Sequence, residues 1–273
     1  MIGKTIPKPA QKGDRPDTIA ELWPGQSVPL LKALHILTQN GGLNADSRRK
    51  LKQVQHLAQL VKPAIDAAMA EKPEPVLADL GAGKSYLGFI LYDLYFGQRG
   101  RVVAVEARAD LIATAKKIAA ESGFARMDFV EGTIAAAQVG PVDIVTALHA
   151  CDTATDEAIQ FALRHEAKYV ALVPCCQAEV ARALDGKTGN LAQLWRHPIQ
   201  RREFGAHLTN VLRALYLEAH GYRVRVTELT GLEHSLKNEF IFAERHQKSN
   251  PRARAEFEKL AAETGASPTL LTF

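Results

Sequence analysis

The chain has few cysteines, no long apolar run and no large excess of one charge. Its three cysteines are Cys151, Cys175 and Cys176. None has the spacing of a disulfide framework, which favours a reducing compartment. No apolar run approaches the roughly 20 residues that span a bilayer, and the first residues lack the apolar core of a secretory signal. We therefore expect a cytoplasmic protein that does not contact a membrane.

A formal net charge of +4 permits an anionic partner such as RNA but does not require one. No basic stripe with interleaved aromatic residues occurs, so base stacking has little support. One basic run, Arg48-Arg49-Lys50-Leu51-Lys52, has helical spacing, and Arg48 and Lys52 would share a face. That face suits either a phosphate contact or simple solvation. Nothing in the sequence indicates an oligomeric state.

The pattern along the chain predicts four segments. Residues 1–26 are rich in proline, lysine and glycine and indicate an irregular arm. Two helical stripes, the second preceded by the capping residue Asn44, predict a helical N-terminal extension over 27–73. Residues 74–245 alternate strand and helix signals, and 246–273 predict a C-terminal helix and tail. No internal repeat is found.

The alternating segment predicts an α/β fold. Short β-rich runs occur at 75–80, 101–106, 126–131, 142–148 and 168–174, and helix-like spacing separates them. Such alternation implies right-handed crossovers and a parallel sheet covered on both faces. Two more strands, at 222–228 and 237–244, are separated by too few residues for a crossover helix. We therefore predict a Rossmann-like seven-stranded sheet that ends in an antiparallel hairpin.

The most informative stretch is Val76-Leu77-Ala78-Asp79-Leu80-Gly81-Ala82-Gly83-Lys84-Ser85. An apolar strand closing on an acid and turning through glycines is typical of nucleotide-binding loops. A phosphate loop would use Lys84 and Ser85, but Asp79 would then repel the phosphates. A dinucleotide fold needs a small residue where this chain has Tyr86. An S-adenosylmethionine (SAM) pocket explains more, because glycines permit backbone approach and Asp79 can engage the cofactor's ammonium group.

Two later strand ends favour the SAM pocket. The second strand ends on Glu106, whose carboxylate can accept two hydrogen bonds from ribose hydroxyls. The third strand ends in polar residues up to Thr133, which suit the edge of the adenine ring. We therefore predict that SAM is the cofactor and that Asp79, Gly81, Gly83, Glu106 and Thr133 bind it.

These strands and the terminal hairpin resemble a class I SAM-dependent methyltransferase over 74–245. The runs Asp79-Leu80-Gly81-Ala82-Gly83-Lys84, Leu148-His149-Ala150-Cys151-Asp152 and Val173-Pro174-Cys175-Cys176 resemble, more narrowly, a branch that includes a tRNA ribose 2′-O-methyltransferase. That branch usually has glycine where this chain has Ser85 and Asp152. The zinc-binding cysteine and histidine modules of the tRNA enzyme are missing from this chain. The resemblance implies an RNA substrate, with tRNA favoured.

The strand ends that carry His149, Cys151, Cys175 and Cys176 meet at one crevice in a doubly wound sheet, and several chemistries fit them. A zinc site is disfavoured because adjacent cysteines on extended backbone point apart. Cys175 could act as the nucleophile of an RNA cytosine-C5 methyltransferase, although the second motif of that family is missing. His149 could act as a general base. The cysteines could also be small buried apolar residues.

The sequence therefore predicts a SAM-dependent methyltransferase that acts on RNA by direct in-line transfer, with no metal. His149, Asp152 and Cys175 are the candidate catalytic residues. The alternatives are a cytosine-C5 enzyme, a small-molecule or protein methyltransferase, and an inert SAM-binding or RNA-binding module.

Overall fold

The computed structural model describes residues 21–273 except 24, 149, 151, 176 and 230–238. Seven strands form one sheet in the order β3-β2-β1-β4-β5-β7-β6. The parallel strands are β1 (Val76–Leu80), β2 (Arg101–Glu106), β3 (Met127–Glu131), β4 (Ile144–Leu148) and β5 (Tyr169–Val173). Their bounds lie within two residues of the predicted ones, and the predicted α/β fold class is confirmed.

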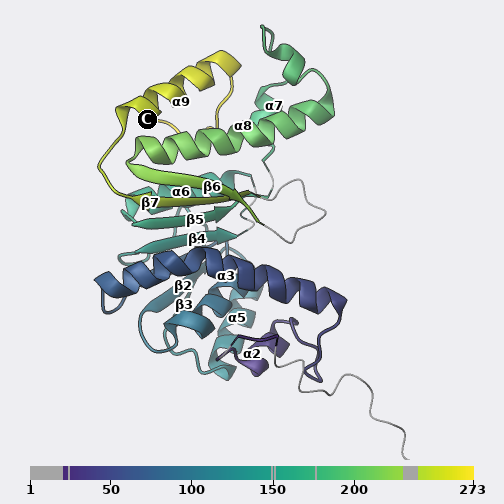
Figure 1. Cartoon of the computed structure of the whole chain (residues 1–273), viewed down its shortest axis with the longest axis vertical. Helices are drawn as coiled ribbons and strands as arrows, with labels where there is room; N and C mark the ends of the chain where they lie inside the picture. The colour runs from purple at the N-terminus through teal and green to yellow at the C-terminus, as the bar shows by residue number, and fades with distance from the viewer. Residues whose placement is uncertain (1–20, 24, 149, 151, 176, 230–238) are drawn as a thin grey trace, which may run out of the picture.

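The last two strands form the predicted antiparallel hairpin. β6 (Tyr222–Glu228) pairs with β7 (Glu239–Arg245), and β7 pairs antiparallel with β5. Strand β7 therefore lies between β5 and β6 and reverses the direction of the sheet at this edge. Figure 1 shows the strands stacked along the long axis, with α8 and α9 at the β6 end and α2 and α5 at the opposite end.

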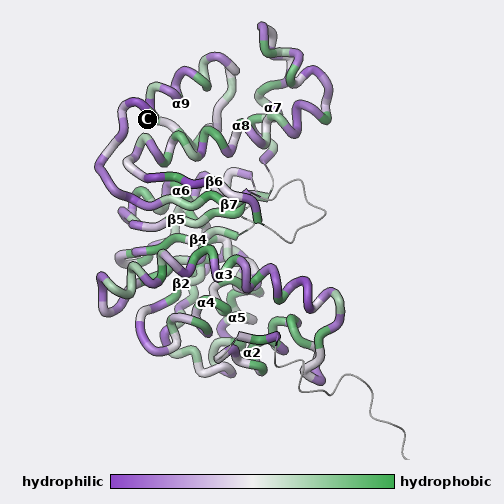
Figure 2. Tube along the Cα trace, in the orientation of Figure 1, coloured by the Kyte–Doolittle hydropathy of each residue, from purple (hydrophilic) through white to green (hydrophobic). Residues whose placement is uncertain are grey.

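Helices cover both faces of the sheet. In chain order they are α2 (Val28–Ala33), α3 (Ala45–Glu71), α4 (Tyr86–Leu91), α5 (Ala109–Glu121), α6 (Thr153–Arg164), α7 (Glu179–Ala183), α8 (Pro198–Ala219) and α9 (Pro251–Thr264). A π-helical turn (Tyr92–Phe96) extends α4, and a 3-10 turn (Ala192–Leu194) precedes α8. One hydrophobic cluster joins α2, α3, α4 and α5 to one face, and a second joins α6, α8 and α9 to the other. Figure 2 shows hydrophobic stretches concentrated in β4, β5 and β7.

The segment predicted as an N-terminal extension packs within the first cluster. Leu57, Val61 and Ile65 of α3 share that core with Leu77 of β1 and Ile144 of β4. Asn44 caps α3 as predicted, because its side chain accepts a hydrogen bond from the Ser47 amide at 2.8 Å. Helix α3 is therefore one of the helices that cover the sheet rather than an appendage.

Among the described residues, no helix is both long enough and apolar enough to cross a membrane.

Candidate functional site

The glycine loop after β1 surrounds a cavity at the carboxyl edge of the sheet. Gly81 and Gly83 adopt left-handed backbone with φ values of 60° and 57°. A Cβ added at Gly83 would meet no atom within 4 Å. The cavity has a volume of about 220 Å³ and is lined by Asp79, Gly81, Ala82, Gly83, Lys84, Tyr86, Leu87 and Leu148. The loop therefore leaves open space beside a bare backbone, which suits close approach by a ligand.

Asp79 is buried at the end of β1 and lines this cavity. Its Oδ1 accepts a hydrogen bond from the Thr146 hydroxyl at 2.9 Å, and its Oδ2 accepts one from the Gly88 amide at 3.2 Å. Burial raises the pKa of Asp79 to about 6 despite these two bonds. A cation bound in the cavity would lower the pKa of Asp79 again, because an adjacent positive charge favours the ionised carboxylate.

Gly88 is a residue of this site that the sequence did not single out. A Cβ at Gly88 would lie 3.0 Å from Oδ2 of Asp79 and 3.0 Å from Oγ of Ser85. The first turn of α4 can therefore approach the carboxylate only because position 88 lacks a side chain. The helical spacing of the segment gave no signal for this close contact.

Glu106 at the end of β2 is held by main-chain donors. Its Oε2 accepts a hydrogen bond from the Gly83 amide at 2.7 Å, and its Oε1 accepts one from the Arg108 amide at 3.0 Å. The Glu106 side chain is 12% exposed. The structure thus brings together three of the predicted cofactor residues, Gly81, Gly83 and Glu106, with Asp79 at the base of the loop.

Thr133 lies outside the lining of the cavity. It is exposed, and its hydroxyl accepts a hydrogen bond from the Ala136 amide at 3.3 Å, which closes a turn. The next residue, Ile134, reaches the glycine loop, since its Cδ1 lies 3.6 Å from the position of a Cβ added at Gly81. The loop after β3 therefore borders the cavity, although Thr133 does not line it.

The candidate catalytic residues lie on the neighbouring strand ends. His149, Cys151 and Cys176 fall outside the described residues, so their predicted roles have no structural account here. Cys175 is half-buried after β5. Leu148 and Val173 are paired in register, so the ends of β4 and β5 lie side by side, and Leu148 lines the cavity.

Asp152 connects these two loops. Its Oδ1 accepts hydrogen bonds from the Ala178 and Glu179 amides at 2.9 and 3.1 Å, and its Oδ2 accepts one from Arg182 at 3.1 Å. Burial acts to raise the pKa of Asp152, but these hydrogen bonds outweigh it and lower the pKa below the ordinary range. The geometry fits a residue that fixes loop position better than one that removes a proton.

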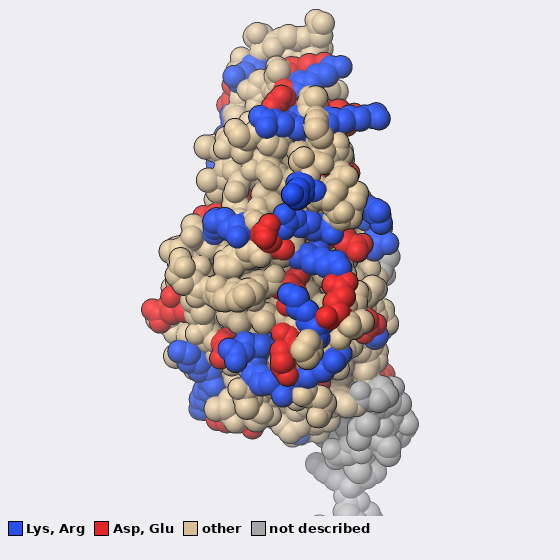
Figure 3. Space-filling model, turned by 90° about the vertical axis from the view of Figure 1, so that its left-hand side faces the viewer, with Lys and Arg blue, Asp and Glu red and all other residues tan. Residues whose placement is uncertain are grey.

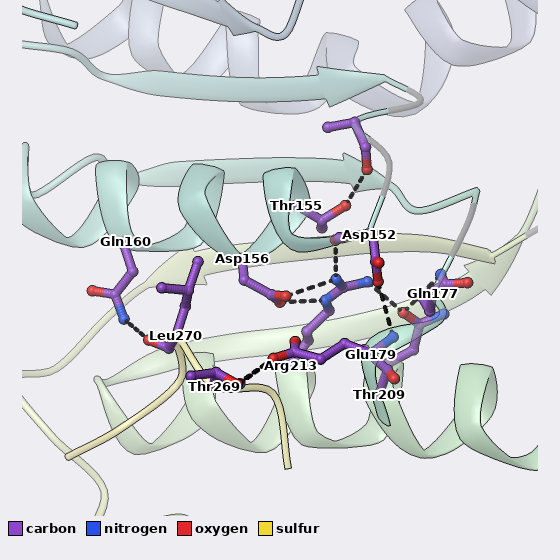
Figure 4. A network of polar contacts seen from close by, with 12 residues as sticks. Asp152, Thr155, Asp156, Gln160, Gln177, Glu179, Thr209, Arg213, Thr269 and Leu270 are labelled. Carbon is purple, nitrogen blue, oxygen red and sulfur yellow. Dashed lines mark hydrogen bonds and ion pairs between the residues drawn. The ribbon is translucent and has the colours of Figure 1, made fainter. Parts of the chain in front are cut away.

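A buried polar network supports the same two loops, as Figure 4 shows. Arg213 of α8 is 1% exposed and binds both oxygens of Asp156 on α6, at 2.6 and 3.0 Å. It also donates to the carbonyl of Asp152 at 2.8 Å and to Oδ1 of Asn210 at 3.1 Å. Asn210 in turn receives a hydrogen bond from Gln177 at 3.3 Å.

The basic run at the start of α3 is largely paired with acids. Arg48 forms an ion pair with Glu21, while Arg49 and Lys50 both contact Asp46. Figure 3 shows positive and negative side chains interspersed on one face of the molecule, with uncharged areas between them. Among the residues that the structure describes, no group of three His, Cys, Asp or Glu side chains is arranged to hold a metal ion.

Residues 49–183 match a family model described as a methyltransferase domain. This part of the chain is similar to a methyltransferase domain. The match runs from α3 to the end of α7 and includes all five parallel strands and the glycine loop. The match supports the predicted enzyme class, a SAM-dependent methyltransferase, and the predicted cofactor, SAM, for this part of the chain. The phosphate-loop alternative has little local support, because the hydroxyl of Ser85 is buried.

A curated cattle protein, described as a glutathione S-transferase C-terminal domain-containing protein, is 27% identical over 226 residues. The alignment covers 74% of this chain but only 34% of that protein. The chain thus spans about a third of the length of its curated relative.

Solved methyltransferase structures also resemble the chain. The Podospora anserina methyltransferase PaMTH1 is 14% identical with a TM-score of 0.48, covering 90% of this chain and 100% of that one. Magnesium protoporphyrin IX methyltransferase from Synechocystis is 13% identical with a TM-score of 0.46, covering 79% and 94%. A putative tRNA (m1A22) methyltransferase from Streptococcus pneumoniae is 17% identical with a TM-score of 0.44, covering 81% of each chain.

Proposed function

We propose that the methyltransferase domain transfers a methyl group to RNA, with tRNA as the favoured substrate. The cofactor half of this proposal is supported by the glycine loop and by Glu106, which the Gly83 amide orients at the neighbouring strand end. The RNA half is supported by the motifs at the ends of β4 and β5, which resemble those of a tRNA ribose methyltransferase branch.

The described residues fit SAM at distinct points. Each oxygen of Glu106 accepts one main-chain hydrogen bond and retains capacity for a ribose hydroxyl. Gly81 and Gly83 leave backbone open for the amino-acid part of the cofactor, and Asp79 offers a buried carboxylate near its ammonium group. The turn that Thr133 caps would border the adenine. These assignments are part of the proposal.

When bound, SAM supplies an electrophilic methyl group whose bond to sulfur breaks as the acceptor's lone pair attacks, with the bonding electrons remaining on sulfur. The protein's contribution is alignment, which can supply several kcal/mol of the barrier reduction. Asp79 and Glu106 fix the donor end. The loops after β4 and β5 flank the acceptor, and Asp152 holds them together through Ala178 and Glu179.

One proton leaves the acceptor during transfer to nitrogen or oxygen. His149 is the candidate to receive it, because an imidazole with an ordinary pKa near 6.5 exchanges protons at neutral pH. Cys175 is the candidate to line the acceptor side. Asp152 serves as a positioning residue in this proposal, since its hydrogen bonds occupy both of its oxygens.

Two measurements test the proposal. Calorimetry with SAM and with ATP tests the cofactor, and tight ATP binding without SAM binding would refute it. Transfer of tritiated methyl from SAM into separate RNA, protein and metabolite fractions tests the substrate. We expect label in RNA, concentrated in the tRNA fraction. Strong label in protein or metabolites with none in RNA would contradict the RNA assignment while leaving the methyltransferase assignment intact.

A further inference from the structure

Lys84 is the only cation that lines the glycine-loop cavity among the described residues. The lining contains one acidic residue, Asp79, and one basic residue, Lys84, and its other members are uncharged. Asp79 is 2% exposed, whereas Lys84 is exposed to solvent. The cavity therefore has a buried negative charge at its base and an exposed positive charge on the loop.

The main chain at Lys84 is fixed, while its side chain has no partner. The Ser85 amide donates to the carbonyl of Ala82 at 2.7 Å, which closes a tight turn through Gly83 and Lys84. The Gly83 amide donates to Oε2 of Glu106, which ties the same turn to β2. Among the residues that the structure describes, the Lys84 side chain takes part in no hydrogen bond or ion pair. A fixed turn thus carries an ammonium group whose three donors are unused.

The acids beside the loop are satisfied without Lys84. Both oxygens of Asp79 accept hydrogen bonds from other groups. Glu106 accepts hydrogen bonds from two amides, and Nε of Arg108 lies 3.8 Å from its Oε1. Lys84 is therefore not the counter-ion of either carboxylate, and its charge is available to a ligand in the cavity.

The two charges on the lining complement those of an amino acid. The amino-acid part of SAM carries an ammonium group and a carboxylate on the same carbon atom, so a site that holds both ends needs an anion and a cation. Lysine binds an oxyanion as a point charge. A phosphate suits this position less well than a carboxylate, because it carries more negative charge and Asp79 lines the same cavity.

We infer that Lys84 binds the carboxylate of the amino-acid part of SAM and makes the site selective for the intact amino acid. Asp79 and Lys84 then bind the two charged groups of one ligand. This inference rests on the cofactor half of the proposed function and is independent of the RNA half. A SAM analogue that lacks the carboxylate leaves Lys84 without a partner and is bound more weakly.

Decarboxylated SAM tests this role, because it keeps the adenosine, the sulfonium and the ammonium group. Calorimetry with the full chain compares its Kd with that of SAM. We expect the wild type to bind SAM at least about tenfold more tightly than the analogue, since a charged hydrogen bond is lost with the carboxylate. The variant Lys84→Met should bind SAM about tenfold more weakly than the wild type and should bind the two compounds with Kd values within about threefold of each other.

Two further variants serve as controls. Lys84→Arg keeps the positive charge and should keep most of the preference for SAM. Lys116→Met on α5 removes an exposed cation that has no ion pair among the described residues and does not line the cavity, so both Kd values should stay unchanged. The midpoint of thermal unfolding of unliganded Lys84→Met should equal that of the wild type, because the side chain has no contact to lose.

The outcomes separate this inference from the proposed function. If the wild type binds neither compound, the cofactor assignment fails and the inference falls with it. If the wild type binds SAM but does not prefer it to the analogue, or if Lys84→Met keeps the preference, the cofactor assignment stands and the inference is wrong. Equal weakening of both compounds in Lys84→Met would also overturn it, because that result indicates a disturbed loop. Loss of the preference in Lys84→Met, with its retention in Lys84→Arg, would support it.

Discussion

The amide of Gly83 donates a 2.7 Å hydrogen bond to Oε2 of Glu106, which ties the loop after β1 to the end of β2. The opposite oxygen is held by the Arg108 amide at 3.0 Å. Both donors belong to the main chain, so the carboxylate is oriented before any ligand arrives. Preorganisation of this kind lowers the ordering cost of binding.

We predict that Glu106→Gln weakens SAM binding by roughly 10- to 100-fold, because hydrogen bonds to a charged group contribute about 1.5–3 kcal/mol. The glutamine NH2 group would also set a donor against the Gly83 or the Arg108 amide. Calorimetry measures the affinity. The control is Glu121→Gln on α5, whose carboxylate is 62% exposed. Equal SAM affinity in the two variants would remove Glu106 from the cofactor site.

The second prediction concerns pH and Asp79, whose pKa is raised by burial from 3.8 to about 6. Between these values the folded protein binds a proton that the unfolded chain has released. The free energy of unfolding should therefore fall as pH rises from about 4 to about 6 and level off above that. A difference of about two pKa units corresponds to roughly 3 kcal/mol. Urea denaturation across this pH range measures the change.

The variant Asp79→Asn should abolish the contribution of this residue to the pH dependence of the free energy of unfolding. Its Oδ1 can accept from the Gly88 amide while its Nδ2 donates to the Thr146 hydroxyl, so both present contacts have neutral equivalents. At pH 7.5 we expect equal or greater stability of the unliganded variant, together with at least about tenfold weaker SAM binding from the lost charge. Unchanged SAM affinity in this variant would show that Asp79 is only a structural link between β1, β4 and α4.

The third prediction concerns the two positions where the resembling branch has glycine. Ser85 and Asp152 both keep positive φ, at 57° and 51°. Left-handed backbone costs a non-glycine residue about 1–2 kcal/mol. Asp152 offsets this through its contacts with the β5–α7 loop, whereas the buried hydroxyl of Ser85 has no hydrogen-bond partner among the described residues.

Ser85→Gly should therefore raise the free energy of unfolding by about 1 kcal/mol, since it relieves the backbone and removes the unsatisfied hydroxyl. Chemical denaturation measures this. The matched variant Ser85→Ala keeps a Cβ at the same left-handed position, so it should gain less. If alanine stabilises as much as glycine, the hydroxyl rather than the backbone is the source of the cost.

The strands and the glycine loop could be predicted because their signals are local. The β1 sequence closes on Asp79 and turns at Gly81 and Gly83 within a few residues, and the predicted strand ends agree with the structure. The helix over 45–71 was also visible as a stripe of apolar residues. The packing of this helix on the sheet could not be predicted. An apolar stripe indicates that one face of a helix is buried, but it does not indicate which surface covers that face.

The polar network could not be predicted from the sequence. Arg213 and Asp156 are 57 positions apart, and Gln177 and Asn210 are 33 apart. Each of these residues lies in an ordinary helical or loop context, and only the fold brings their side chains together. The sequence singled out Asp152 as a candidate catalytic residue because it follows β4, but its bonding to the β5–α7 loop depends on the register of β4 and β5.

The fourth prediction concerns the ion pair between Arg213 and Asp156, in which both side chains are 1% exposed. Removing one member of a buried pair leaves an uncompensated charge, which typically costs about 3–5 kcal/mol. We expect Arg213→Met and Asp156→Leu each to lose stability in this range, as measured by urea denaturation. Arg254 and Glu258 form an exposed pair on α9, and removing Glu258 should cost at most about 0.5 kcal/mol.

The double variant Arg213→Met/Asp156→Leu distinguishes a structural pair from a positioning role. Apolar residues of similar volume can replace a buried ion pair at little cost, so the double variant should be more stable than either single one. It should nevertheless lose methyl transfer, because the carbonyl of Asp152 loses the donor that fixes it and Oδ1 of Asn210 keeps only its bond from Gln177. A stable double variant with full activity would limit Arg213 to folding.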